Sequence, residues 1–481
     1  MIDLRPVGYV IGLLIATLGA AMLFPMALDL ATGNGHWQAF LQSAVITILA
    51  GALLALACAN AARSLTVRQA FVLTTGVWVM LPLFGSLPFM LGEPGANLTD
   101  AVFEAMSGMT TTGATVFVGL DALPQGTNLW RGILQWLGGL GIVIVALIFL
   151  PVMKVGGMQF FRSEGFDTMG KILPRALDIS AALIRIYIGL TLACVVSFLA
   201  LGLSGFDAVV HALATVSTGG FSSYDASFAA FAGPAEYAAA VFMVLASLPF
   251  IRFVQLTQGS WLPFWRDPQV RAYLRWTGYV VAMIVAYRVL VLGAAPLTAL
   301  REVLFNTVSI WSGTGFLSAD VLGWGPFAFV LLMIAGFIGG CTSSTGCSVK
   351  VFRYLIVFEA VKTQIRRLLS PHAVQPVRYD GRPVDADIVN SVIVFFTLFV
   401  LSFGVLAVAL SMTGLQTRTA LTAAWTSIAN IGPAWGAAVG QTGALHQFPD
   451  AAKWLMIAGM LVGRLELLSV YVLFTARFWG R

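Results

Sequence analysis

The chain has 481 residues, of which 59% are hydrophobic and 10% are charged, whereas an ordinary soluble protein carries about 25% charged residues. So little polar surface excludes a soluble globular enzyme of this size and predicts an all-α membrane protein with many spans, each of about 20 apolar residues. The net charge of +6 does not by itself indicate nucleic acid, because the charges must first be assigned to the two sides of a membrane.

The first apolar run, residues 7–28, follows Arg5 in the way a signal peptide follows its basic residue. The run is as long as a complete span and no small-residue cleavage site follows it, so we expect a retained first helix. Nine further apolar runs predict spans near residues 39–60, 69–92, 130–153, 181–204, 235–258, 276–298, 326–365, 387–412 and 451–478.

The charged residues predict the orientation of these spans. If the N-terminus is cytoplasmic, 22 of the 27 Lys and Arg residues lie on the inner side, as the positive-inside rule requires. Eleven of the 21 acidic residues then face outward. An acidic outer face would concentrate cations at an entrance, although ordinary solvated loops account for the charges equally well.

The same order of predicted elements occurs four times in the chain: an apolar span, a half-length helix, a turn centred on glycine, and a second span. The half-helices are predicted at residues 101–110, 207–216, 302–311 and 419–430. The turns that follow read Thr111-Thr112-Gly113-Ala114-Thr115, Ser217-Thr218-Gly219-Gly220-Phe221, Gly313-Thr314-Gly315-Phe316-Leu317 and Asn430-Ile431-Gly432-Pro433-Ala434. A single cluster of this kind is often a helix-packing seam, but four in register are not.

Non-helical backbone at membrane depth is tolerated only where protein buries it or where it lines an aqueous cavity. Four glycine-containing turns around one axis would point carbonyl oxygens inward and replace the hydration shell of K⁺. The negative ends of the half-helix dipoles would face the same cation. The predicted potassium ligands are Thr111, Thr112, Gly113, Ser217, Thr218, Gly219, Gly313, Thr314, Gly315, Asn430, Ile431 and Gly432.

The run at 326–365 is too long for one crossing, and ten small or polar residues interrupt it at 339–348. We expect a broken helix with a loop beneath the turns, and a kinked helix packed in the core is the alternative. The last run contains Arg464 and Glu466, and charges inside a membrane are functional candidates. The alternative for Arg464 is a structural pair with Glu466 or with backbone.

The chain resembles the Trk/Ktr/HKT superfamily of potassium transporters, and most closely its TrkH branch, over essentially its whole length. The resemblance rests on FEAMSGMTTTGATV (103–116), LQWLGGLGIVIVA (134–146), ATVSTGGFSSYDASF (214–228), NTVSIWSGTGFLSAD (306–320), GGCTSSTGCSVKVFR (339–353), IANIGPAWG (428–436) and GRLELL (463–468). It implies four pseudo-symmetric helix–pore loop–helix repeats around one pore, preceded by two extra helices. It also implies that Gly113, Gly219, Gly315 and Gly432 are the selectivity glycines, and glycine at all four positions favours potassium.

The resemblance further implies that the 339–350 loop is an intramembrane gate. The gate residues carried over are Gly340, Ser343, Thr345, Gly346, Lys350 and Arg464. Ser343 replaces the usual glycine, and Cys347-Ser348 replaces the usual glycine pair, which affects the expected flexibility of the loop. The implied domains are two N-terminal helices (1–66) and four repeats (67–155, 156–260, 261–370 and 371–481).

Family members are homodimers in the plasma membrane, which is the inner membrane of a bacterium, and they associate with a cytosolic nucleotide-binding ring called TrkA. The basic segment from Lys362 to Arg382 is expected to meet anionic lipid or this partner.

We therefore predict gated potassium uptake without a catalytic cofactor. One alternative is a Ktr-type sodium-dependent subunit, against which the two extra N-terminal helices argue. The other is a broken-helix transporter of a small solute, which would usually show two repeats rather than four. An enzyme is not expected, because the chain has no Walker A loop and no catalytic set around its four histidines or four cysteines.

Overall fold

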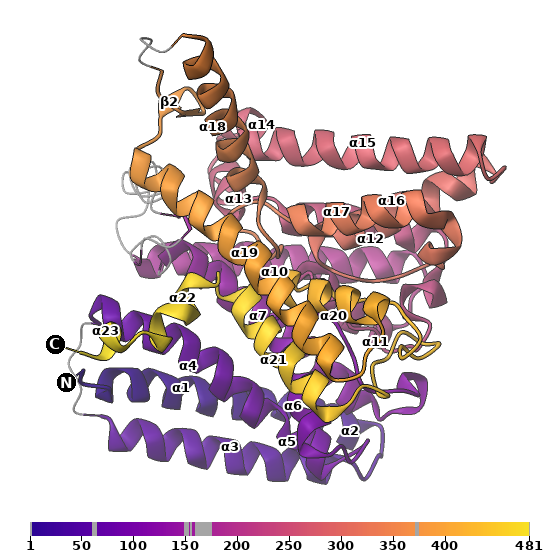
Figure 1. Ribbon diagram of the computed structural model, residues 1–481. Coiled ribbons are helices and arrows are strands. Elements are labelled where there is room, and N and C mark those ends of the chain that lie inside the picture. Colours follow the sequence, from indigo (N-terminus) through magenta and orange to yellow (C-terminus); the bar gives the residue numbers. More distant parts are fainter. Residues whose placement is uncertain are drawn as a thin grey trace.

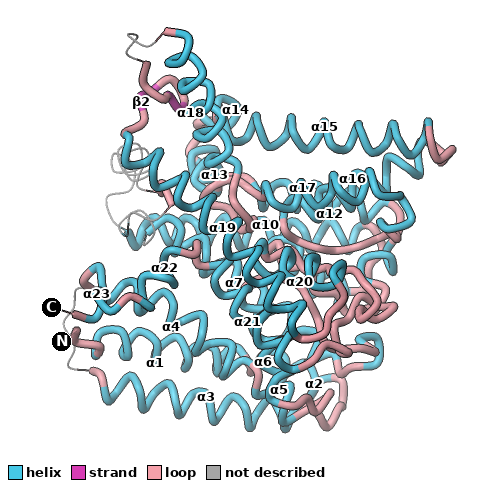
Figure 2. The backbone as a smooth tube through the Cα atoms, in the orientation of Figure 1, coloured by secondary structure: helices cyan, strands magenta, loops and turns pink. Residues whose placement is uncertain are grey.

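The computed structural model describes residues 2–59, 65–148, 153, 156–158, 176–370 and 375–480. In this part of the chain the regular elements are helices, apart from one short hairpin of β1 (Arg378–Tyr379) and β2 (Arg382–Pro383), and loops connect them. Both termini lie at one end of the molecule, and the long loops gather at the opposite end around α11 and α20 (Figures 1 and 2). Seven of the described helices are long and apolar enough to cross a membrane, and two bent pairs bring the total to nine.

The chain begins with a closely packed helix pair. One partner is α1 (Arg5–Ala21), which continues into α2 (Leu23–Ala31), and the other is α3 (Trp37–Ala57). A Cβ on Gly12 would lie 2.7 Å from the carbonyl oxygen of Gly51, so the two backbones are nearly in contact. Small residues permit this approach, which is how helices associate where lipid removes the hydrophobic driving force.

Four groups of helices follow in the order that the sequence predicts. The first group contains α4 (Val67–Gly85), α5 (Leu87–Leu91), α6 (Leu98–Met109) and α7 (Gln125–Ile148). The second contains α10 (Ala176–Ala200), α11 (Gly205–Val216), α12 (Pro234–Ser247) and α13 (Phe250–Thr257). The third contains α14 (Leu262–Arg266), α15 (Pro268–Leu290), α16 (Pro296–Ser312), α17 (Gly325–Ile338) and α18 (Val351–Leu369). The fourth contains α19 (Ala386–Met412), α20 (Thr417–Ala429), α21 (Asp450–Arg464), α22 (Leu468–Tyr471) and α23 (Ala476–Trp479).

Four single-turn helices complete the described elements: η1 (Leu120–Ala122), η2 (Ser227–Phe231), η3 (Val321–Trp324) and η4 (Val472–Phe474). The predicted domain limits remain predictions. The limit after residue 155 and the start of the last repeat at 371 both fall on residues outside those described.

Three of the predicted spans are broken rather than continuous. The run at 326–365 divides into α17 and α18, as expected, with the 339–350 loop between them. The runs at 235–258 and 451–478, each predicted as one span, bend by 94° between α12 and α13 and by 107° after Arg464. Pro249 lies at the first bend, and the second contains Glu466 and Leu467 with positive φ. A proline and left-handed residues each interrupt the helical hydrogen-bond ladder.

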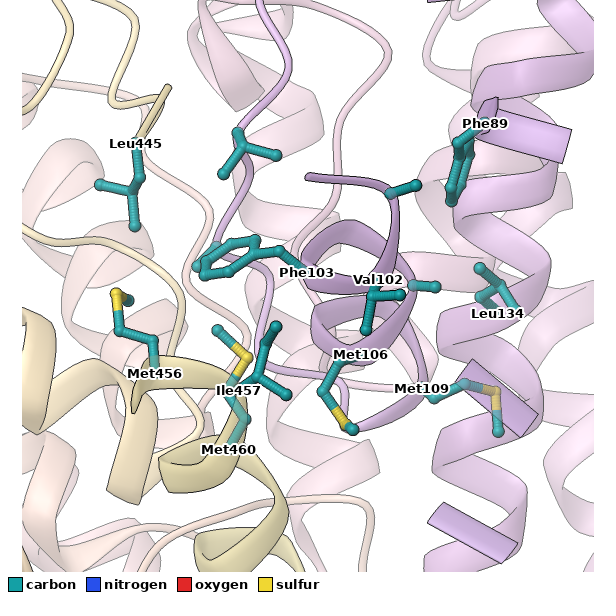
Figure 3. Packing of buried hydrophobic residues seen from close by; sticks show 14 of the residues in the cluster. Phe89, Val102, Phe103, Met106, Met109, Leu134, Leu445, Met456, Ile457 and Met460 are labelled. Carbon is teal, nitrogen blue, oxygen red and sulfur yellow. The ribbon is translucent and has the colours of Figure 1, made fainter. Parts of the chain in front are cut away.

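Each half-helix is held inside the protein by apolar side chains. Figure 3 shows Phe103 and Met106 of α6 facing Met456 and Met460 of α21, while Leu134 of α7 lies on the other side. Asn97 caps α6 through the backbone N–H of Asp100, and Ser204 caps α11 in the same way. These two caps satisfy N–H groups that would otherwise be unpaired at the starts of α6 and α11.

Several charges that the sequence assigns to the outer loops are instead buried in pairs. Glu104 pairs with Arg131 over 2.8 Å, and both are at most 1% exposed. Buried Asp29 accepts from the Gly126 backbone, and buried Glu236 pairs with Arg301. The sequence left open whether the outer acidic residues lie in solvated loops, and these three are instead buried against partners, as a buried charge requires.

Candidate functional site

The four glycine turns begin where the four half-helices end. Thr111, Thr218, Gly313 and Asn430 occupy the first turn position, and all four have left-handed backbone with φ between 51° and 81°. The next residue of each turn donates its N–H to the carbonyl five positions earlier, over 2.8–3.2 Å (Thr112 to Ser107, Gly219 to Ala214, Thr314 to Ser309 and Ile431 to Thr426). The third position is a glycine with positive φ in every turn: Gly113, Gly220, Gly315 and Gly432. We call residues 111–113, 218–220, 313–315 and 430–432 the turn segments.

This common hydrogen-bond pattern corrects the sequence alignment of the second segment. The sequence places Gly219 level with Gly113, but the structure places Gly220 there. Gly219 is level with Thr112, and its φ is not positive. The second predicted turn therefore begins one residue too early, because Ser217 still belongs to the end of α11 as its C-cap.

The turn segments lie against one another in a closed ring. A Cβ on Gly113 would overlap the carbonyl oxygen of Gly219, and a Cβ on Gly220 would overlap that of Thr314. A Cβ on Gly315 would overlap the carbonyl oxygen of Ile431. A Cβ on Gly432 would lie 2.8 Å from the carbonyl oxygen of Thr112, which closes the ring in chain order. Only glycine fits these positions, because each combines positive φ with a neighbouring backbone.

The ring opens into one cavity of about 470 Å³. Gly113, Gly220, Gly315 and Gly432 all line it, and the residues that follow them form its walls. Asp225 and Asp320 line the cavity as well, together with Arg131. We call this space the vestibule.

Each half-helix holds the strand that leaves its turn through one polar side chain. Glu104 accepts from the backbone N–H of Val116 at 3.0 Å, and Asn306 accepts from Ser318 at 3.1 Å. Thr422 accepts from Trp435 at 3.0 Å. In the second repeat His211 Nε2 lies 3.0 Å from Ser222 Oγ, so this histidine supports the turn rather than binding a metal. Within the described part of the chain, no group of three His, Cys, Asp or Glu residues could hold a metal ion.

The sequence analysis missed Gln135 on α7. Its Nε2 donates to the Gly219 carbonyl at 2.5 Å, and its Oε1 accepts from the Phe221 N–H at 3.0 Å. One amide side chain therefore fixes the backbone on both sides of Gly220. A polar residue in an apolar run, here LQWLGGLG, is the signal that marks such a position.

The 339–350 loop is buried directly beneath the ring. Thr345 Oγ1 donates to the Val216 carbonyl at 3.2 Å and to the Ala246 carbonyl at 3.0 Å, which ties the loop to the second repeat. Cys347 Sγ lies 3.7 Å from Thr111 Oγ1 at the first turn position. Ser343, Ser348 and Lys350 all have positive φ, so the loop holds several non-glycine residues in a conformation that they seldom adopt.

The loop is joined to the break in the last helix by charges. Glu466 forms ion pairs with Lys350, over 3.3 Å, and with Arg353. Arg464 Nη1 instead contacts the Thr345 carbonyl at 3.3 Å and Cys347 Sγ at 2.6 Å. The alternative of an Arg464–Glu466 pair is therefore wrong, because Glu466 is occupied by the two cations of the third repeat.

The predicted site residues thus fall into two adjoining layers. The ring contains Thr111, Thr112, Gly113, Thr218, Gly219, Gly313, Thr314, Gly315, Asn430, Ile431 and Gly432, with Ser217 at the helix end below it. The layer beneath contains Gly340, Ser343, Thr345, Gly346 and Lys350 of the loop, together with Arg464. The hydroxyls of Thr112 and Thr314 bond to Thr110 and Ser312, both over 2.7 Å, and so brace the turns locally.

Comparison with known proteins gives one consistent result. Residues 36–481 match a family model described as TrkH, cation transport protein. The chain is 39% identical to the Trk system potassium uptake protein TrkI of Halomonas elongata, over 98% of this chain and 96% of the relative. It is 34% identical to the Trk system potassium uptake protein TrkH of Escherichia coli K12, over 99% of both chains. The crystal structure of the potassium transporter TrkH from Vibrio parahaemolyticus superposes with a TM-score of 0.92 at 32% identity, and the match covers 99% of this chain and 100% of that one.

Proposed function

The chain belongs to the TrkH family of cation transport proteins, and on that premise we propose that it takes up potassium ions through the ring of four turn segments. The ion is the cargo and not a resident cofactor. A transporter of small organic solutes, the alternative from a different class, does not fit a cation transport family.

One observation carries this proposal: four glycine turns, each from a different repeat, meet in a ring that closes in chain order and opens into the vestibule. The contacts that close the ring are made by backbone carbonyl oxygens, each of which lies against the glycine of a neighbouring segment. Rings of backbone carbonyls are the group that replaces water around a dehydrated potassium ion. The turn segments are therefore proposed as the selectivity filter, with Gly220 joining the residues predicted from the sequence.

The half-helices add to the attraction for a cation. α6, α11, α16 and α20 all end at the ring, so the negative ends of their dipoles face it. Asp225 and Asp320 at the vestibule would raise the local cation concentration before dehydration. These two acids take over part of the role that the sequence assigned to the whole outer face.

The 339–350 loop is proposed as the gate. Lys350, Arg353, Arg464 and Glu466 are all at most 4% exposed, so three buried positive charges face one negative charge beneath the filter. Excess positive charge in a medium of low dielectric raises the energy of a passing cation. Movement of the loop together with Arg464 would remove both the steric and the electrostatic barrier.

We place the protein in the inner membrane of a bacterium, with its N-terminus in the cytoplasm, and we propose that it works as a homodimer. α18 and the β1–β2 hairpin project from the body at one corner (Figure 1), and Lys362, Arg366 and Arg367 lie on that helix. This projection is proposed as the surface for a TrkA-type regulatory ring or for anionic lipid. Residues 371–374 of the basic segment lie outside the described residues.

Expression in a bacterium that lacks its own potassium uptake tests the function. The chain should restore growth on low-potassium medium, and the purified protein in liposomes should pass rubidium in preference to sodium. Equal permeation of the two ions, or uptake of a small organic solute instead, would contradict the proposal.

A further inference from the structure

We propose that Cys347 is the positioning residue that latches the gate shut, and that its thiol is a modification site exposed only when the gate loop moves. The proposal rests on the proposed function, since it concerns regulation of the same pathway.

The thiol of Cys347 meets two different parts of the protein. Its Sγ lies 2.6 Å from Nη1 of Arg464 and 3.7 Å from Oγ1 of Thr111, and the residue is 4% exposed. The Cβ of Cys347 also lies close to Gly313, because a Cβ added to that glycine would be 3.1 Å from it. The side chain therefore touches the first turn position of two filter segments and the basic end of α21.

Through these contacts the side chain of Cys347 connects three of the four repeats. Cys347 belongs to the gate loop of the third repeat, Thr111 to the filter of the first, and Arg464 to the broken helix of the fourth. A glycine at position 347 would remove the Sγ contacts and leave the filter linked to this part of the loop by backbone packing alone.

Arg464 has few other hydrogen-bond partners among the described residues. Apart from Cys347, the described residues offer its Nη1 only the Thr345 carbonyl, at 3.3 Å, and they offer Nε and Nη2 no hydrogen-bond partner. A buried guanidinium with unpaired donors is costly, so its place depends on the groups that remain. Both remaining partners belong to the gate loop, and hence the loop and Arg464 hold each other in the closed arrangement.

The other loop cysteine is a matched control. Cys341 is equally buried in the gate loop, but its backbone N–H bonds to the Ser247 carbonyl at 2.9 Å at the entry of the loop. It lies away from the filter contacts that Cys347 makes.

Two variants test the latch in liposomes that contain the full chain. Cys347→Gly should raise rubidium flux in the absence of any activator by about fivefold, the shift expected from the loss of one modest side-chain contact. Cys194→Ala, at a buried cysteine of α10 outside the ring and the gate loop, should leave that flux within a factor of about two. Equal basal flux in the wild type and in Cys347→Gly would overturn the proposal.

A thiol reagent tests the exposure of the site. Methanethiosulfonate ethylammonium forms a disulfide with Cys347 Sγ, while methanesulfinate leaves with the bonding electron pair and the thiol proton passes to solvent. The attached cation should reduce rubidium flux in the wild type and in Cys341→Ser, and it should have no effect in Cys347→Ser. Inhibition that persists in Cys347→Ser would overturn the assignment even if the glycine variant did not fold.

The rate at which Cys347 is labelled, followed by mass spectrometry of the protein, tests this inference independently of the transport function. Arg464→Gln removes one side of the latch, so Cys347 should be labelled several times faster than in the wild type, whether or not the protein transports potassium. An unchanged labelling rate would overturn the latch while leaving the proposed function intact. Failure of rubidium flux with faster labelling would count against the function alone.

Discussion

Nε of Arg131 donates a hydrogen bond to Oε1 of Glu104 over 2.8 Å, and both side chains are at most 1% exposed. Glu104 also accepts from the Thr115 hydroxyl and from the Val116 backbone, which leads out of the first filter segment. The ion pair therefore supports the extended segment that leads from the first turn segment along the wall of the vestibule.

Arg131→Met should destabilise the protein by about 3–5 kcal/mol, because it leaves the Glu104 carboxylate buried without its counter-charge. The measurement is thermal unfolding in detergent, in which the variant should melt well below the wild type. Arg185→Met on exposed α10 is the control, and its melting temperature should not change. Equal melting of the two variants would show that the Glu104 pair adds no stability.

Gly220→Ala should impair potassium selectivity more than Gly219→Ala does. Gly220 has φ of +76°, and a Cβ there would overlap the Thr314 carbonyl oxygen, which is backbone and part of the ring. A Cβ on Gly219 would instead press on the side chain of Gln135, so it would disturb the two hydrogen bonds of that amide but would not overlap a carbonyl oxygen of the ring. The ratio of rubidium to sodium uptake in liposomes is the measurement.

The reverse order of those two variants would place Gly219, and not Gly220, at the level of Gly113. That outcome would restore the alignment expected from the sequence. Equal ratios of rubidium to sodium uptake in both variants and the wild type would show that the second turn segment does not contribute to selectivity.

Gly113→Ser and Gly432→Ser should each lower discrimination of potassium against sodium by about tenfold, a change of about 1.4 kcal/mol between the two ions. Each serine would push on a neighbouring carbonyl and widen or distort the ring. Gly119→Ser is the matched control, because Gly119 also has positive φ but has open space around its Cβ position. A similar loss in Gly119→Ser would attribute the effect to backbone strain rather than to the ring.

Arg464→Gln should increase basal ion flux severalfold, since it removes one of three buried positive charges beneath the filter and one contact of the gate loop. Rubidium flux at equal protein density is the readout, with exposed Arg185→Gln as the control. Unchanged or lower flux at normal expression would assign Arg464 a purely structural role.

Gly51→Leu should lower the melting temperature by several degrees, because a side chain there would overlap the backbone of α1 at Gly12 and Ala16. Overpacking of this kind costs about 1–3 kcal/mol. Gly189→Leu in the exposed part of α10 meets no atom within 4 Å and should melt with the wild type. Ion selectivity should be unchanged in both variants, as these helices lie outside the ring.

The repeat architecture was accessible from the sequence because its signals are local. Apolar runs, half-length helical patterns and glycine turns each occupy a short window, and their order along the chain is the order of the repeats. The register within Ser217-Thr218-Gly219-Gly220 was not accessible, since two adjacent glycines fit the pattern equally well. The end of α11 at Val216 decides between them.

The partners of the buried charged residues also could not be predicted from the sequence. Arg464 and Glu466 are close in the chain and suggest a pair, but the turn between them directs Glu466 to Lys350 and Arg353. Glu104 and Arg131 look like residues of outer loops until α6 and α7 pack side by side. Gln135 acquires its role only because Gly219 and Phe221 come to lie beside α7.

The amino-acid sequence by itself determined that the chain spans a membrane, that its unit repeats four times, and, in three of the four units, which glycine interrupts it. Those properties follow from hydropathy and backbone freedom, which act between near neighbours in the chain. The tertiary structure alone decided which carbonyl faces which glycine, which cation Glu466 neutralises, and that Cys347 lies against Arg464. Such contacts join residues more than ninety positions apart, so they depend on how the helices bend and pack and not on any local pattern.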